Sequence, residues 1–351
     1  MHPQTVDQAM ELLCMIQQPA FCIRNNGTMV CNEAGKYLCP SCSAELSAWL
    51  GNAKIAYDLW DRSGQLQLTV SVLDGLYSVI LQQLQDGTLF LMHEHCNISL
   101  ADNAMAVTSQ VLRQPLSELT VLLNQIQRNT DFYAAPFYRQ IYRMSRIVFN
   151  LTQTGRLNSN DPTLNITRLD TQSYPGKLLT EVEELCKCTG RTFSCSAPAA
   201  PLTFYADKTL LNCALLNLIS NAMKFSPAET PIRLRIDVVN THLVFQVENT
   251  CAGNGSELLR SAFSRLSQRG VIPDTKWGVG LGLPLVSTIA RLHNGMLAVE
   301  TTGGRAIVSL SISMRDREDD VLHSPVMIDY TGGMRQSLLE LSDALPVKAF
   351  E

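Results

Sequence analysis

Hydrophobic side chains in the N-terminal part of the chain change from helical to strand-like spacing. Residues 6–17 place apolar side chains on one helical face, and alternating runs flank Asn26-Gly27, a pair typical of a hairpin turn. Three further strand-like runs follow, at residues 66–73, 76–84 and 88–93. The pattern predicts a small mixed domain over residues 1–97, made of one hairpin, short helices and a three-stranded meander.

Longer helical patterns follow. Residues 98–128 carry apolar side chains three, four and seven apart, and residues 136–151 repeat them at alternating steps of four and three. The seam of the second helix consists of Phe137, Ile141, Met144, Val148 and Leu151. Two helices joined near residues 129–131 bury one stripe on each other, and the leftover apolar stripe predicts a dimeric four-helix bundle over residues 98–158. The alternative is a plain coiled-coil spacer.

The pattern of residues 159–314 predicts a mixed α/β domain. Its helical segments are expected at residues 177–188, after Asp207 with an apolar face from Leu210 to Ile219, and at residues 285–292. Its strands are expected at residues 232–239, 243–248, 296–300 and 306–312. Residues 315–351 form a tail that begins with a charged stretch and contains a helix from Met334 to Leu341. This tail either packs on the preceding domain or recruits a partner.

Composition narrows the possible functions. The 351 residues carry a net charge of −4, which argues against non-specific nucleic-acid binding. No apolar run reaches the roughly 18 residues of a membrane span, and the N-terminus lacks the pattern of a signal peptide. We therefore expect a cytoplasmic protein. Cys39 and Cys42 form a CxxC pair, but no second close pair follows, so a plain loop is favoured over a zinc site.

A run of glycines near the C-terminal helix suggests anion binding. Gly278, Gly280 and Gly282 alternate with bulkier residues and lead into a helical segment. Glycines at such a place free backbone N–H groups to point at an anion, and the helix dipole favours negative charge there. The alternative is a tight turn before a core helix, so the prediction depends on partners elsewhere in the chain.

Asn217 and Asn221 supply such partners. They lie four residues apart, on one helical face, and Lys224 follows them. This segment resembles the N box of two-component sensor histidine kinases and of the wider Bergerat-fold ATPases. The resemblance implies that Asn221 binds Mg²⁺ and that Asn217 and Lys224 approach the phosphates of ATP. Gyrase-like ATPases carry a glutamate at the position of Asn217, so hydrolysis of that type is not expected.

The segment VENTCAG resembles the G1 box of the same family, with Val247 and Gly253 in place. Asn249 stands where the family has the adenine-binding aspartate. An asparagine still accepts a hydrogen bond but loses the charge-assisted part, on the order of 1 kcal/mol. Cys251 replaces a glycine and adds bulk where the backbone approaches the nucleotide. We expect ATP binding to be weakened rather than abolished.

Two more boxes complete the resemblance. Phe263 and Arg265 match the F box, and the glycine run follows at the distance of the G2 box, which forms a phosphate lid. The resemblance assigns nucleotide contacts in this last box to Gly278, Gly280, Leu281, Gly282 and Leu283.

The first long helix contains SQVLRQPLSEL, which resembles the H box of sensor histidine kinases. Gln110 replaces the phosphoacceptor histidine and Val111 replaces the adjacent acidic residue. An amide nitrogen has no useful basicity, so phosphorylation at the usual place is not expected. Gln114 lies where some family members orient the water that dephosphorylates a receiver domain. The alternative for Gln114 is a solvent-facing side chain, which we favour.

Together these features predict an α+β multidomain protein. Residues 1–97 resemble a PAS-type sensor domain, with any small α+β domain as the alternative. Residues 98–158 form an antiparallel helical hairpin in a dimeric four-helix bundle, and residues 159–314 form a Bergerat α/β sandwich ATP-binding domain. Residues 315–351 are a tail of unassigned role.

The resemblance implies an ATP- and Mg²⁺-binding member of the histidine kinase superfamily. We expect a homodimeric pseudokinase that regulates a response-regulator receiver domain or a partner histidine kinase. One alternative is an active kinase or phosphatase that works on a partner in trans or uses Gln114 on a receiver. Another is a dimeric scaffold that binds no nucleotide.

Overall fold

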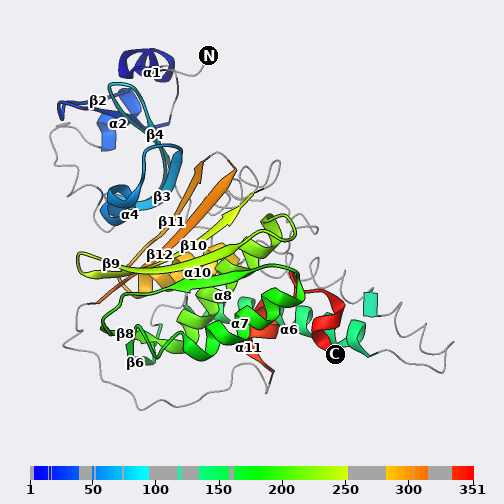
Figure 1. The fold of residues 1–351 in the computed structure, drawn as a ribbon. Helices are drawn as coiled ribbons and strands as arrows, with labels where there is room; N and C mark the ends of the chain where they lie inside the picture. Colours follow the sequence, from blue (N-terminus) through cyan, green and yellow to red (C-terminus); the bar gives the residue numbers. More distant parts are fainter. Residues whose placement is uncertain are drawn as a thin grey trace.

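The structure is a computed structural model, shown in Figure 1. The residues that it describes are 4–14, 16, 18–38, 50, 53–72, 75–94, 118–119, 134–157, 162–251, 282–302, 304–314 and 334–351. They form an N-terminal unit and a larger α/β unit that share one sheet (Figure 1).

The N-terminal unit contains the predicted hairpin and meander. Its helices are α1 (Val6–Leu13), α2 (Glu33–Leu38) and α4 (Lys54–Leu59). Its strands are β1 (Ala20–Arg24), β2 (Met29–Cys31), β3 (Gln65–Val72), β4 (Gly75–Gln83) and β5 (Gly87–Glu94). They lie in the order β2-β1-β5-β4-β3 over a core that includes Phe21, Leu68, Leu81, Phe90 and Met92. The predicted strands are confirmed, while α1 ends four residues before the predicted helix end at residue 17.

The larger unit places helices against one face of its sheet. The sheet strands are β7 (Phe193–Ser196), β9 (Ile232–Val239), β10 (His242–Thr250), β11 (Leu297–Thr302) and β12 (Arg305–Ser313). The helices are α7 (Gly176–Cys188), α8 (Lys208–Phe225) and α10 (Gly282–Leu292). A separate two-stranded sheet pairs β6 (Ile166–Asp170) with β8 (Thr203–Asp207). This arrangement confirms a mixed α/β domain.

Helix α8 is central to the hydrophobic core. Asp207 caps its N-terminus, because its carboxylate accepts hydrogen bonds from the backbone N–H groups of Thr209 and Leu210. Apolar side chains of α8 and α10, among them Leu211, Leu215, Ile219 and Ile289, share one hydrophobic core with Phe245 and Leu310 of the sheet. Each fully buried side chain of this size stabilises the fold by about 1.5–3 kcal/mol before entropy is counted. The helix is therefore a rigid platform for the polar residues it carries.

The two units are joined edge to edge. Strand β3 pairs antiparallel with β11, with Leu68 opposite Ala298 and Gln65 opposite Thr301, which yields one ten-stranded sheet in the order β2-β1-β5-β4-β3-β11-β12-β10-β9-β7. The chain enters this junction at Gly64, where a Cβ atom would lie 2.2 Å from the carbonyl oxygen of Thr301. Only glycine allows such a close approach without displacing a strand. The sequence patterns did not predict this pairing.

Two acidic residues lie at the same junction. Asp61 precedes β3 and Glu300 lies on β11, and their carboxyl groups share a hydrogen bond. Arg305 reaches Asp61 with its Nη2 atom, 3.4 Å from Oδ2. Burial, the hydrogen bond and the charge of Asp61 raise the pKa of Glu300 to about 7. Near neutral pH, Glu300 is therefore partly protonated at the junction.

Helix α6 (Ala135–Leu157) confirms the second predicted helix of the hairpin, but it packs differently from the expected seam. Its buried residues include Gln140, Arg146, Ile147, Asn150 and Gln153, whereas Val148 of the predicted seam is 52% exposed. The other helix lies outside the described residues except for residues 118–119, so the bundle and the dimer stay predictions.

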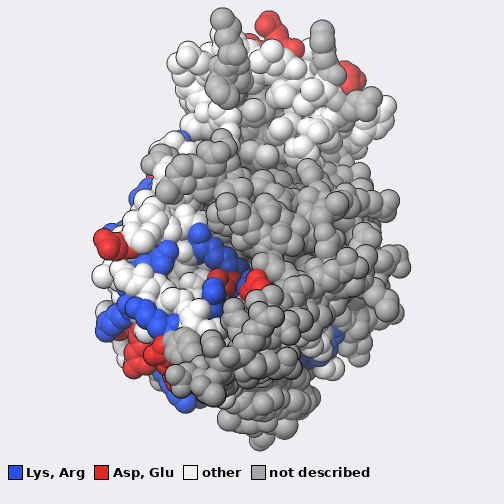
Figure 2. All heavy atoms as spheres, turned by 90° about the vertical axis from the view of Figure 1, so that its right-hand side faces the viewer, with Lys and Arg blue, Asp and Glu red and all other residues white. Residues whose placement is uncertain are grey.

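The C-terminal segment packs on the α/β unit. Its elements are α11 (Gln336–Leu341) and the 3₁₀ helix Val347–Phe350, and both lie beside α6. Leu339, Leu341, Leu345 and Phe350 are buried there. Figure 2 shows basic side chains around a small acidic group on the side where Figure 1 places α6 and the C-terminus. Of the two roles the sequence allowed for the tail, packing on the preceding domain is observed.

Among the helices that the structure describes, none combines the length and hydrophobicity that a bilayer crossing requires.

Candidate functional site

One face of α8 carries the predicted phosphate and metal residues. Asn217, Asn221 and Lys224 follow each other at helical spacing; Asn217 is fully buried and the other two are half-buried. Helix α10 begins at Gly282, where a Cβ atom would lie 2.8 Å from Asn217 Oδ1. The last glycine of the run therefore lies directly against the first asparagine. Leu283 lies in the hydrophobic core, so its side chain contributes packing.

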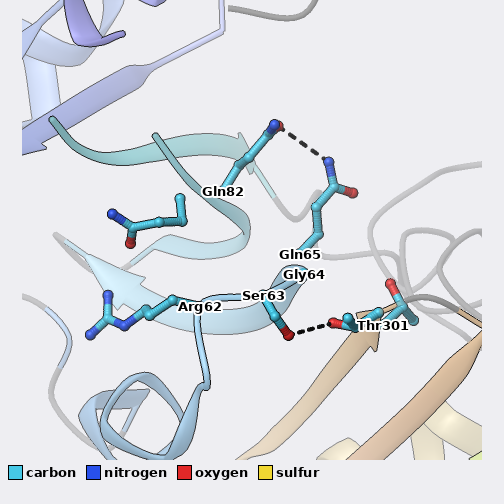
Figure 3. A pocket seen from close by; sticks show the side chains of 8 residues that line it. Arg62, Ser63, Gly64, Gln65, Gln82 and Thr301 are labelled. Carbon is cyan, nitrogen blue, oxygen red and sulfur yellow. Dashed lines mark hydrogen bonds between the residues drawn. The ribbon is translucent and has the colours of Figure 1, made fainter. Parts of the chain in front are cut away.

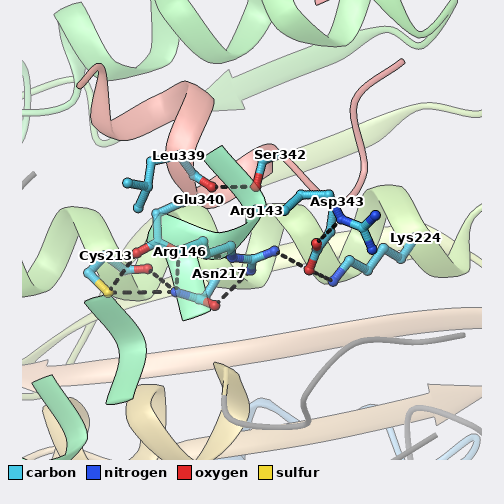
Figure 4. A network of polar contacts seen from close by, with 9 residues as sticks. All are labelled: Arg143, Arg146, Cys213, Asn217, Lys224, Leu339, Glu340, Ser342 and Asp343. Atoms are coloured by element: carbon cyan, nitrogen blue, oxygen red, sulfur yellow. Dashed lines mark hydrogen bonds and ion pairs between the residues drawn. The ribbon is translucent and has the colours of Figure 1, made fainter. Parts of the chain in front are cut away.

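The side chain of Asn217 is fully engaged in a buried network (Figure 4). Its Oδ1 accepts a hydrogen bond from Arg146 Nη2 at 3.0 Å. Its Nδ2 donates to Glu340 Oε2 and to the carbonyl oxygen of Cys213, both at 3.0 Å. Arg146 Nε also donates to Glu340 Oε2 at 3.2 Å, and Cys213 Sγ donates to Glu340 Oε1 at 3.2 Å. Three segments distant in sequence thus meet at this asparagine.

The carboxylate of Asp343 gathers three cations beside this network (Figure 4). Its Oδ2 accepts from Lys224 Nζ at 3.0 Å and from Arg146 Nη1 at 2.8 Å. Its Oδ1 accepts from Arg143 Nε at 3.1 Å. Charge-assisted bonds of this length are among the stronger polar interactions in proteins. The C-terminal segment therefore holds Lys224, one of the predicted phosphate residues, as well as Asn217.

Burial and neighbouring charges shift the pKa values of Asp343 and Glu340 in opposite directions. Burial raises the pKa of Asp343, but the nearby cations Lys224, Arg146 and Arg143 outweigh it and hold the pKa well below its ordinary value. Burial dominates at Glu340 and raises its pKa, although Arg146 opposes the shift. Asp343 is therefore ionised at neutral pH, whereas Glu340 takes up a proton more readily than an exposed glutamate.

Asn249, the residue predicted to bind adenine, lies on β10. Asn249 is 3% exposed, and its Nδ2 donates to the carbonyl oxygen of Thr250 at 3.3 Å and to Cys251 Sγ at 3.4 Å. Cys251 is itself buried, and its backbone N–H donates to the carbonyl oxygen of Gly304. The thiol thus occupies the space beside Asn249 and uses part of its donor capacity. That this bulk lies near a bound adenine stays a prediction.

Several predicted site residues lie outside the described residues. They are Gln110, Gln114, Gly253, Phe263, Arg265, Gly278, Gly280 and Leu281. The structure brings Gly282 against Asn217 and places Asn221 and Lys224 on the same helix, while the nucleotide roles of all these residues stay predictions.

Sequence reasoning missed the residues that surround Asn217 and Lys224. Arg139, Arg143 and Arg146 lie at helical spacing on α6, opposite the apolar seam, and Glu340 and Asp343 lie three residues apart in the tail. A basic stripe on one segment and an acidic pair on another were the available signal. Periodicity alone does not tell which charged stripes meet.

A polar pocket of about 270 Å³ lies elsewhere, at the junction of the two units (Figure 3). Its lining includes Arg62, Ser63, Gln65, Gln82 and Thr301. Gln65 Nε2 donates to Gln82 Oε1 at 3.3 Å, so part of the lining is already paired. None of the predicted nucleotide residues lines this pocket, and we assign it no function.

The donor set on α8 fits ATP and Mg²⁺. The amide oxygen of Asn221 is a suitable hard ligand for Mg²⁺, which takes few protein ligands and completes its shell with phosphate oxygens and water. Lys224 offers an ammonium group for a phosphate, and Gly282 lets the start of α10 approach Asn217 closely. Asn217 and Lys224 are at present engaged by Glu340 and Asp343.

Residues 206–316 match the family described as histidine kinase-, DNA gyrase B- and HSP90-like ATPase. This region contains α8, α10 and strands β9 to β12, and hence the face that carries Asn217, Asn221 and Lys224. The match thus covers the α8 residues and Gly282 of the candidate site but not Arg146, Glu340 or Asp343.

Curated relatives extend the similarity beyond that domain. Sensor protein BasS of Salmonella typhimurium is 29% identical over 220 residues, which is 60% of this chain and 60% of BasS. BasS of Escherichia coli is 27% identical over 254 residues, which is 70% of this chain and 64% of that protein. The chain thus spans less than two thirds of the length of these relatives. Histidine kinase AdeS of Acinetobacter baumannii, a solved structure, is 22% identical with a TM-score of 0.47, covering 58% of this chain and 98% of that one.

The buried asparagine face of α8, the glycine that abuts it and the similarity to sensor proteins agree with one another. Residues 206–316 thus belong to the histidine kinase-, DNA gyrase B- and HSP90-like ATPase family, and the wider similarity to sensor proteins supports a two-component sensor histidine kinase.

Proposed function

We propose that this chain binds Mg-ATP as a pseudokinase, a histidine-kinase-like regulator that does not phosphorylate itself. The observation that carries the proposal is the polar face of α8, where Asn217 abuts Gly282 and Asn221 and Lys224 continue the same stripe. Amide and ammonium groups in this order suit a metal-bound triphosphate.

The residues have distinct roles in this proposal. Asn221 holds Mg²⁺ through its amide oxygen, and Asn217 and Lys224 bind phosphate oxygens. Asn249 accepts a hydrogen bond from the adenine amino group without the charge of an aspartate. The loss of charge costs on the order of 1 kcal/mol, which is a several-fold weaker affinity. Bound Mg²⁺ neutralises phosphate charge, and the chain's own residues orient the nucleotide.

The absence of a phosphoacceptor separates this chain from an autokinase. Gln110 has an amide whose nitrogen lone pair is delocalised, and Val111 has no proton acceptor. Nucleotide binding then acts by changing the position of the helical hairpin. The contact of Arg146 on α6 with Asn217 supports this role, because it links the hairpin directly to the site.

The remaining organisation is part of the same proposal. The hairpin, short helices and meander support a PAS-like sensor unit over residues 1–97. Residues 98–158 form the dimerisation hairpin, and the protein acts as a homodimer on a response-regulator receiver domain or a partner histidine kinase. Gln114 would support receiver dephosphorylation if it orients water, which no described contact tests.

Incubation of the full chain with ATP labelled at the γ-phosphate tests the proposal. We expect no stable acid-labile label on the protein and no label in a Gln110→Asn control. Replacing Gln110 with histidine asks whether the rest of the site is competent, and label on Q110H alone would support the role of residue 110. Stable label on the natural chain would overturn the pseudokinase assignment.

A further inference from the structure

We propose that residues 334–351 occupy the phosphate subsite of the nucleotide site, with the Asp343 carboxylate in the place of a nucleotide phosphate. The segment and Mg-ATP then exclude each other. This inference rests on the proposed function, because it requires that the α8 face binds a nucleotide.

The environment of Asp343 resembles that of a bound phosphate. Lys224, Arg146 and Arg143 all donate to its two oxygens, at 3.0, 2.8 and 3.1 Å. Three cations around one carboxylate exceed what its single charge neutralises. Glu118 Oε2 lies 3.5 Å from Arg143 Nη1 and Glu340 Oε2 lies 3.2 Å from Arg146 Nε, but Arg139 adds a fourth cation, so the three acids still leave one positive charge over. The cluster therefore suits an anion of higher charge, such as the terminal phosphate of a nucleotide.

A buried hydrogen-bond donor without a described partner supports the same proposal. Arg139 lies one helical turn before Arg143 on α6, and the charge of Asp343 acts on it. Its Nε atom is buried and has no hydrogen-bond partner among the described residues. Buried donors are normally satisfied, so an unused guanidinium N–H beside an anion site indicates room for a further acceptor. A phosphate offers more oxygen atoms than the carboxylate of Asp343.

Apolar contacts place the acidic residues at this site. Leu339, Leu341 and Leu345 are almost fully buried, and the rings of Phe350 and Tyr142 lie 5.5 Å apart. Ser337 Oγ donates to Glu181 Oε2 at 2.6 Å, which ties the start of α11 to α7. The segment is thus anchored on both sides of its acidic pair, and the contacts of Asp343 follow from that docking.

Competition follows from shared donors. Glu340 and Arg146 engage Asn217 on both its amide nitrogen and its oxygen, and Asp343 engages Lys224. A nucleotide that uses these two α8 residues must first displace the carboxylates. The apparent affinity then falls by the fraction of molecules with the segment released, so a docked population of 99% weakens binding by about a hundredfold.

Titration of the full chain with Mg-ATP tests the proposal. We compare the natural chain with Asp343→Asn, which removes the charge but keeps the shape, and with Asp58→Asn, which removes a surface ion pair to Lys54. We expect D343N to bind Mg-ATP at least about tenfold more tightly than the natural chain. D58N should bind like the natural chain. Equal or weaker binding by D343N would overturn the role of the segment.

Two outcomes separate this inference from the proposed function. If the natural chain and D343N both bind with equal affinity, nucleotide binding stands and the exclusion fails. If neither binds at millimolar Mg-ATP, the proposed function fails and the exclusion fails with it.

A second measurement needs no variant. Backbone amide exchange in residues 336–345 of the natural chain is followed with and without saturating Mg-ATP. Displacement predicts faster exchange when the nucleotide is present, because the segment leaves its buried position. Slower exchange would contradict the proposal, since it would mean that segment and nucleotide bind together.

Discussion

Replacing Arg146 with methionine tests how much the buried network stabilises the protein. The side chain of Arg146 is 6% exposed and that of Glu340 is 0% exposed, and Arg146 donates to Glu340, Asp343 and Asn217. Methionine keeps much of the volume but leaves the acids without this cation. Removing one partner of a buried ion pair costs about 3–5 kcal/mol, so we expect a decrease of that size in the free energy of unfolding.

The decrease in the free energy of unfolding caused by R146M should depend on pH. Burial raises the pKa of Glu340, and Arg146 lowers it. A carboxyl group whose pKa is higher in the folded than in the unfolded state contributes stability at low pH, which is lost as the pH rises through its folded pKa. Without Arg146 that pKa rises further, so R146M should lose more stability at about pH 8 than at about pH 5.

Urea unfolding followed by circular dichroism measures both effects. Arg235→Met serves as the matched control, because Arg235 is 61% exposed and its ion pair with Asp237 lies on the surface. A surface pair contributes below about 1 kcal/mol. Adding Glu340→Gln to R146M should restore most of the loss, since no buried charge remains unpaired. The reasoning is refuted if R146M costs no more than R235M.

Three further predictions concern the junction and the site. Burial raises the pKa of Glu300 to about 7. The stabilising contribution of Glu300 is therefore complete below about pH 4.5 and disappears as the pH rises through about 7. E300Q should flatten the dependence of the urea midpoint on pH in this range. Gly282→Ala places a Cβ 2.8 Å from Asn217 Oδ1 and should destabilise the protein by about 1–3 kcal/mol in the same unfolding assay. Gly64→Ala places a Cβ 2.2 Å from the Thr301 carbonyl oxygen and should cost a similar amount, about 1–3 kcal/mol, with faster amide exchange in β3 and β11. Unchanged stability would contradict these expectations. It would mean that Asn217 moves away freely in G282A, or that the strand with Thr301 moves away freely in G64A.

Local patterns predicted the elements of both units well. The turn at Asn26-Gly27 depends on neighbouring residues only, and the structure has the hairpin there. The same holds for the helical spacing after Asp207, where the structure has α8. The spacing of Asn217 and Asn221 is also local, so their common face on α8 followed from the sequence. The start of α10 at Gly282 lies three residues before the predicted start, because the glycine run itself enters the helix.

Contacts between distant segments were not predictable in the same way. The pairing of β3 with β11 is a contact between strand edges, and an edge strand has the same alternation whether or not another strand covers it. The predicted seam of α6 included Val148, which is exposed, whereas the polar Arg146 is buried. A buried arginine is acceptable only where partners exist, and Glu340 and Asp343 are almost two hundred residues away in the sequence.

Titration of the natural chain and Asn221→Ala with Mg-ATP tests the central claim most directly. Asn221 is half-buried and its replacement leaves the network of Asn217 intact, so N221A should fold like the natural chain. We predict saturable, Mg²⁺-dependent binding by the natural chain and its loss in N221A. Equal binding by both proteins, or no binding by either the natural chain or D343N at millimolar Mg-ATP, would contradict a nucleotide site on this face of α8.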